Sequence, residues 1–83
     1  MPIEKAGRTG FTDRLASLGE LVVATVGKDT SLLYSIRDLA EAAKGDKKLA
    51  PHSHLVAYVV GLLSASQEIA VEWRQGKLYV GAV

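Results

Sequence analysis

The 83-residue chain contains no cysteine, and this absence excludes several kinds of protein. A disulfide-stapled scaffold, a thiolate zinc site and thiol catalysis all need cysteine side chains. Aromatic residues are also few, with one tryptophan, one phenylalanine and three tyrosines. Hydrophobic residues nevertheless make up 48% of the chain and charged residues 23%, as in ordinary globular proteins. The sequence therefore indicates one small domain with a mostly aliphatic core.

The chain also lacks long hydrophobic runs and a strong charge of one sign. Its longest apolar stretch, residues 55–63, is too short to span a bilayer, and residues 1–5 lack the apolar run of a signal peptide. We therefore expect a cytoplasmic protein that has no membrane partner. The net charge of +1 does not by itself indicate a nucleic-acid partner. Any such function depends on where the ten lysines and arginines lie.

Two helices are predicted in the first half of the chain. Apolar residues recur at helical spacing over residues 13–26, and Thr12 is the expected N-cap. The second helix is expected to begin at Ser35, because Ser35 and Asp38 form the S-x-x-D pattern typical of a capping box. Gly45 is expected to end this helix.

A third helix is predicted over residues 51–66, because Pro51 suits the first turn of a helix. At 100° per residue one side of it is apolar, and we expect that side to face the core. The opposite side carries a stripe of small residues. The predicted core side consists of Leu55, Val56, Val59, Leu62, Leu63 and Ser66, and the small-residue stripe consists of Ser53, Ala57, Gly61 and Ser64.

The end of the chain changes to the alternating pattern of β-strands. A turn at residues 75–76 pairs Trp73 with Leu78 and Val71 with Val80, so that the apolar residues of both strands share one face. A lone hairpin is marginally stable in water, so this face is expected to pack on the helices with Trp73 in the core. Residues 31–34 are expected to pair briefly as an edge strand.

The order of helix, short strand, helix, helix and β-hairpin resembles the winged-helix family. The resemblance covers residues 12–83 and rests on element order and turn positions, not on a signature motif. It implies an α+β fold, with three helices and a C-terminal hairpin wing, and residues 1–11 are expected to form a flexible arm. It also implies double-stranded DNA as the partner, and a role in transcription regulation, with the third helix and the wing in contact with the duplex.

Basic residues occur at the places where this resemblance puts DNA. Three lysines precede the third helix, and two cationic residues flank the wing tip; such residues contact phosphates and bind with low sequence specificity. Residues 52–66 contain no Arg, Lys, Asn or Gln, the usual base-reading residues, so specific base reading is not expected. The expected DNA-binding residues are Lys44, Lys47, Lys48, His52, Ser53, His54, Ala57, Arg74 and Lys77.

A different class of function remains open, namely a protein-interaction or assembly module. Small side chains allow another backbone to approach closely, so the stripe on the third helix suits the sugar-phosphate wall of a DNA groove or a two-fold contact in a homodimer, unless the same domain covers it. Tyr79 is the exposed aromatic residue expected to stack on a base or on a partner. Other apolar residues expected to be exposed are Leu21, Val23, Val60 and Val83, and the expected interface residues are Ala57, Gly61, Ser64 and Tyr79.

The sequence gives no reason to expect an enzyme, a cofactor or a small-molecule substrate. His52 and His54 point about 200° apart on a helix, so they are not expected to share a metal ion. Residues 7–10 contain two glycines but not the spacing of a phosphate-binding loop. No nucleophile and base stand in a recognisable arrangement.

Overall fold

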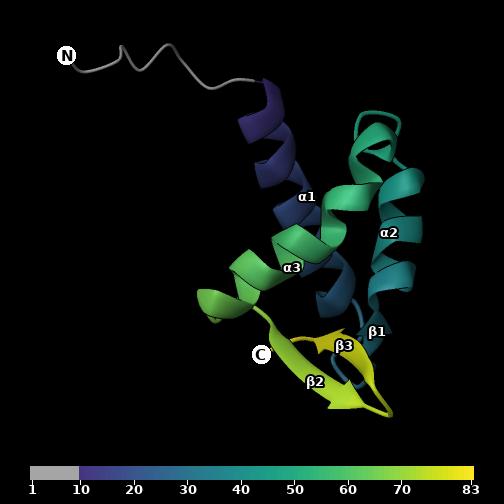
Figure 1. The fold of residues 1–83 in the computed structure, drawn as a ribbon, viewed down its shortest axis with the longest axis vertical. Coiled ribbons are helices and arrows are strands. Elements are labelled where there is room, and N and C mark those ends of the chain that lie inside the picture. Colours follow the sequence, from purple (N-terminus) through teal and green to yellow (C-terminus); the bar gives the residue numbers. More distant parts are fainter. Residues whose placement is uncertain (1–9) are drawn as a thin grey trace, which may run out of the picture.

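A computed structural model describes residues 10–83, which form an α+β fold. Three α-helices, one 3₁₀ helix and a three-stranded antiparallel sheet follow one another along the chain (Figure 1). The expected fold class is confirmed at this level. The elements are α1 (Gly10–Gly27), β1 (Tyr34–Ser35), α2 (Ile36–Lys44), the 3₁₀ helix η1 (Ala50–Leu55), α3 (Val56–Ala65), β2 (Ala70–Arg74) and β3 (Lys77–Gly81).

Helix α1 begins three residues earlier than its apolar pattern indicates. Because it starts at Gly10, Thr12 lies inside the first turn and is not the N-cap, so that prediction is wrong. A capping signal is a local preference, and a longer helix overrides it. Of the expected arm, residues 10 and 11 belong to α1 and residues 1–9 lie outside the described residues.

Helix α2 begins with the capping box that the sequence predicts. The Asp38 backbone N–H donates to the Ser35 hydroxyl oxygen at 3.0 Å, and the Ser35 N–H donates to the Asp38 carboxylate at 3.0 Å. Both bonds satisfy backbone donors that a bare helix start would leave unpaired. The helix buries Leu39 and Ala43 against α1 and α3, and its C-cap is Gly45, as expected.

The segment after α2 differs from the single long helix predicted from Pro51. It starts as η1, and α3 begins only at Val56. The face of α3 that meets the core is also rotated from the predicted one. Val60, expected to be exposed, is buried, and Leu62, expected to be buried, is 51% exposed. Because α3 is apolar on nearly every side, its periodicity did not identify the buried face.

The hairpin has the predicted register, with Trp73 opposite Leu78 and Val71 opposite Val80. Gln75 and Gly76 both have positive φ, as a two-residue type I′ turn requires. The strand order is β1-β3-β2, so β3 is central. The expected strand at residues 31–34 is shorter and lies at Tyr34–Ser35.

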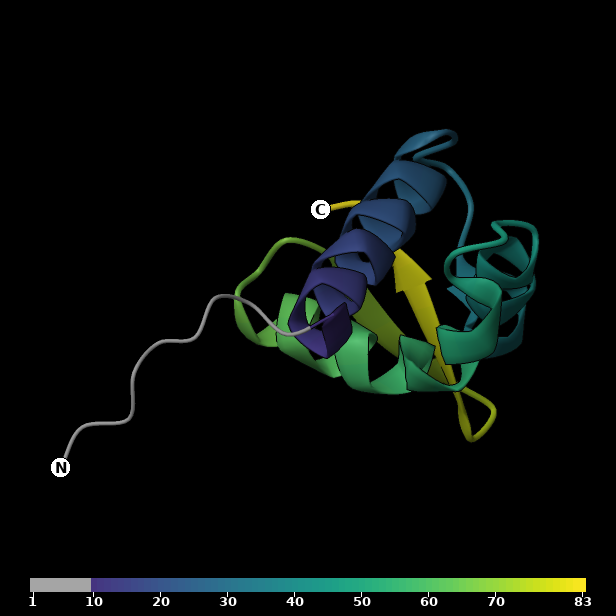
Figure 2. The ribbon, with the colours of Figure 1, turned by 90° about the horizontal axis from the view of Figure 1, so that it is seen from above.

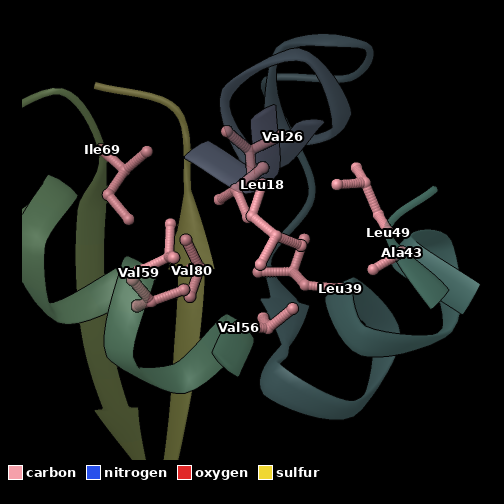
Figure 3. Close-up of a cluster of buried hydrophobic side chains, with 11 residues drawn as sticks. Leu18, Val26, Leu39, Ala43, Leu49, Val56, Val59, Ile69 and Val80 are labelled. Carbon is pink, nitrogen blue, oxygen red and sulfur yellow. The ribbon is translucent and has the colours of Figure 1, made fainter. Parts of the chain in front are cut away.

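The helices cover only part of the sheet. Seen from above, the three helices surround β3 (Figure 2), and Val80 of that strand is fully buried. Every residue of β2 is exposed, and Trp73 is 70% exposed, so the expectation of a core tryptophan is wrong. The alternation placed Trp73 on the correct face, but β2 lies at the sheet edge, beyond the helices. The core consists of Leu18, Val22, Val26, Leu39, Ala43, Leu49, Val56, Val59, Val60, Ile69 and Val80 (Figure 3).

Candidate interaction surfaces

One candidate surface is a groove between α1 and the connection from α2 to η1. Lys47 and Lys48 line this groove. They are therefore exposed, as expected of residues that contact DNA. The groove is not cationic, however, because acidic residues line it as well, and the Lys48 backbone N–H donates to the Asp46 carboxylate at 2.9 Å. Its charged and polar lining consists of Asp13, Arg14, Ser17, Glu20, Asp46, Lys47, Lys48 and His52.

A second candidate surface is the hairpin tip with the start of α2. Arg74 Nε donates to the Glu72 carboxylate at 2.9 Å, so a neighbouring acid already partners this cation. Lys77 lines a shallow hollow together with Arg37 and Asp38. Each basic residue at the tip therefore has a carboxylate on the same small surface.

The two groups of basic residues do not meet. The α2–η1 connection, with Lys47 and Lys48, lies at the opposite end of α2 from the hairpin tip, with Arg74 and Lys77 (Figure 1). Nine helical residues span about 13 Å, and α2 separates the groups by at least this length. Lys44, at the far end of α2, lies 3.4 Å from the Glu41 carboxylate. The basic residues expected to contact DNA therefore do not converge into a single cationic cleft.

The histidines lie in η1 and not in the first turn of α3. His52 and Ser53 are half-buried, and His54 is exposed. α3 starts only at Val56, so both histidines precede its first turn. Within residues 10–83, no three His, Asp or Glu side chains gather into a metal site.

The small-residue stripe of α3 is only partly open. Ala57 and Gly61 are exposed, and a Cβ built on Gly61 would meet no atom within 4 Å. Ser64 is half-buried. Tyr79 is also half-buried, in a hollow with Leu33 and Arg74 on the face of the sheet that points away from the helices. Two of the four expected interface residues therefore lie on open surface.

Two larger side chains beside this stripe were missed by the sequence reasoning. Tyr58 is 56% exposed and Leu62 is 51% exposed. They lie one turn apart and follow Ala57 and Gly61 directly in the sequence. The sequence feature that could have indicated their exposure is the lack of any charged residue on α3. Without charged residues, the solvent side of the helix carries apolar side chains, as its core side does.

Exposed apolar side chains lie on both α3 and β2, two elements that follow one another in the chain. Val59 of α3 lies beside Val80 of β3 (Figure 3). Val71 is directly opposite Val80 on the same face of the sheet, and Trp73 is two residues further along that face. Leu62 is one helical turn from Val59. We call this the α3–β2 surface and define it as Ala57, Tyr58, Gly61, Leu62, Val71 and Trp73.

Other exposed large apolar side chains are scattered. Val23 lies on α1, Leu32 lies in the connection between α1 and β1, and Val83 follows β3. Val83 is exposed, as expected. Single exposed apolar residues are normal on protein surfaces and need no partner. The α3–β2 surface differs because its members are grouped on two consecutive elements.

No protein-family model, curated protein or solved structure matches this chain. No helix within residues 10–83 is long and apolar enough to cross a membrane.

Proposed function

We propose that this chain is a winged-helix-type interaction module that binds another protein chain through the α3–β2 surface. The winged-helix class rests on the order of helices and strands. The observation that carries the function is that Tyr58, Leu62 and Trp73, on the consecutive elements α3 and β2, are each at least half exposed. Groups of large exposed apolar side chains mark interaction sites, because leaving them in water is unfavourable.

The chemistry of this surface suits protein better than DNA. The exposed side of α3 offers no cation and no amide to a base edge or a phosphate. Tyrosine and tryptophan are enriched at the centres of protein interfaces, from which lysine and acidic residues are depleted. The separation of Lys47 and Lys48 from Arg74 and Lys77 further weakens the DNA model, since a modest set of phosphate contacts is split between two ends of α2.

A labelled DNA duplex separates the two classes of function. Non-specific DNA binding typically has a dissociation constant of about 1–100 µM and weakens steeply with salt, so titration at about 50 mM salt detects it. The proposal expects no change in fluorescence anisotropy there. Salt-sensitive binding that disappears when Lys47, Lys48 and Arg74 are reversed together would refute the proposal in favour of DNA.

A display library of random peptides tests protein binding without knowledge of the partner. The chain is expected to select peptides rich in apolar residues, and Leu62→Glu is expected to abolish that selection. Leu32→Glu is the matched control, because Leu32 is 49% exposed against 51% for Leu62 and lies outside the α3–β2 surface. No selection by the wild-type chain, or equal selection by both variants, contradicts the proposal.

A further inference from the structure

Strand β2 is an open edge of the sheet. Among residues 10–83, the order β1-β3-β2 leaves one side of β2 without a neighbouring strand. The other edge, β1, is only two residues long and continues directly into α2, so it offers almost no backbone for pairing. β2 is five residues long and every one of its residues is exposed. An exposed edge strand of this kind is a template for pairing with another chain.

The backbone groups at the open edge belong to Val71 and Trp73. A two-residue type I′ turn closes on a hydrogen-bonded pair, which here is Arg74 with Lys77. Hydrogen-bonded and non-hydrogen-bonded pairs then alternate along an antiparallel ladder. The N–H and C=O groups of Val71 and Trp73 therefore point away from β3. No other backbone within residues 10–83 bonds to them.

The strand lacks most of the features that usually block edge pairing. Proteins protect edges with proline, charged side chains, a bulge or a charge on the inner face, and of these β2 has only two charged side chains, both on its outer face. The sequence of β2 is Ala-Val-Glu-Trp-Arg, its pairing with β3 is regular, and its inner face carries only Val71 and Trp73. A partner strand would therefore meet free hydrogen-bonding groups and apolar side chains together.

The charges on the other face of β2 indicate which partner fits. Glu72 and Arg74 flank Trp73 and lie on the same face. If a second β2 pairs antiparallel around Trp73, each Glu72 lies directly opposite the partner copy's arginine at position 74. Opposite charges at facing positions stabilise a strand pair, and like charges destabilise it. The strand is thus complementary in charge to itself.

We propose that β2 pairs edge to edge with β2 of a second copy, antiparallel and two-fold about Trp73, so that two sheets join into one. This inference rests on the proposed function, because it names a partner and a contact for the β2 part of the α3–β2 surface. The two-fold arrangement places the two Trp73 residues directly opposite each other, forms the Glu72–Arg74 pair twice, and pairs the free backbone groups of Trp73.

Charge reversal tests this pairing. Glu72→Arg and Arg74→Glu each turn both ion pairs into like-charge pairs, so each variant alone is expected to dimerise at least about tenfold more weakly than the wild type. An equimolar mixture of the two variants restores opposite charges across the strands and is expected to recover the dimer. Glu20→Arg and Arg37→Glu are the controls, because they change the net charge identically at exposed positions outside β2. Sedimentation over a concentration series measures all of these.

Amide hydrogen exchange by NMR gives a second readout that does not depend on any variant. Dimerisation is expected to slow exchange at the Trp73 amide, which bonds across the two-fold, and to leave α3 unchanged. A wild-type dimer that ignores both charge reversals but is lost in Leu62→Glu overturns the strand pairing and leaves protein binding by α3 intact. A chain that stays monomeric up to about 1 mM also overturns the pairing. In that case, the selection of peptides from the display library still tests whether the chain binds other proteins.

Discussion

The exposed tryptophan gives the sharpest test of how the hairpin sits on the helices. We expect Trp73→Ala to destabilise the fold less than Leu39→Ala, although tryptophan is by far the larger side chain. Trp73 is 70% exposed and Leu39 is fully buried. A buried tryptophan covers up to about 250 Å², so roughly 75 Å² of Trp73 is covered here.

The two losses differ in size and in origin. At about 25 cal/mol per Å², the covered part of Trp73 contributes at most about 2 kcal/mol, and a compact unfolded state lowers this figure. Leu39→Ala leaves a cavity between α1, α2 and α3, and such substitutions cost about 2–5 kcal/mol. If the sequence-based expectation of a core tryptophan held, Trp73→Ala would cost about 3–5 kcal/mol.

Urea denaturation followed by far-ultraviolet circular dichroism measures both variants, because this signal does not depend on the tryptophan that is removed. Dilute protein keeps any association out of the comparison. Acrylamide quenching of the single tryptophan in the wild type is an independent check, and strong quenching is expected. A loss of about 3 kcal/mol or more for Trp73→Ala, or a shielded tryptophan in dilute solution, would refute the exposed β2 and with it the α3–β2 surface.

Three further outcomes follow from local structure. Ser35→Ala removes the acceptor for the Asp38 N–H and is expected to lower the free energy of unfolding by about 1 kcal/mol in urea denaturation. Gly61→Ala is expected to raise it by about 0.5–1 kcal/mol, because the added Cβ meets no atom within 4 Å and alanine favours the helix. The Ser31 hydroxyl and then its backbone N–H donate to the Asp29 carboxylate and lower the pKa of Asp29 below its ordinary value. These bonds stabilise the folded state at pH values above the pKa that Asp29 has in the unfolded chain. This stabilisation is lost as the pH falls through the lowered pKa of Asp29 in the folded chain. In an NMR titration, Ser31→Ala is expected to raise the pKa of Asp29 again.

The hairpin shows what a sequence pattern can and cannot predict. Its register came from the alternation of apolar residues and from the turn at Gln75 and Gly76, and both signals are local. Whether Trp73 is covered depends on how far the helices extend over the sheet, which no local pattern states. The face of Trp73 was therefore predictable and its burial was not.

The third helix shows the same limit in another form. The length of this helix was overestimated because Pro51 also fits the first turn of a 3₁₀ helix. Its buried face was misassigned because Leu62 and Val60 are both apolar. Periodicity identifies a core face only when the other face is polar. The same absence of polar residues that misled the assignment is what makes α3 a candidate interface.

The expected DNA site required residues far apart in the sequence to converge. Lys47 and Lys48 follow α2, and Arg74 and Lys77 flank the hairpin turn, as the sequence predicted. The distance between the two pairs depends on the direction of α2 through the fold. A helix that begins beside the sheet and ends away from it carries Lys47 and Lys48 to the far end. The sequence gives the positions of the charged residues along the chain but not the direction of α2 relative to the sheet.

The area of the proposed β2–β2 contact determines how stable the dimer is. Stable interfaces bury about 800 Å² on each partner, and one pair of short edge strands with its flanking side chains covers less. The half-exposed Tyr58 and Leu62 extend the apolar area beyond β2, but they lie on α3, outside the strand pair itself. Strand pairing alone therefore favours a reversible, concentration-dependent dimer, whereas a partner that covered both β2 and α3 would bind more tightly. Since the two partners compete for Trp73, an apolar peptide that binds the α3–β2 surface is expected to dissociate the dimer.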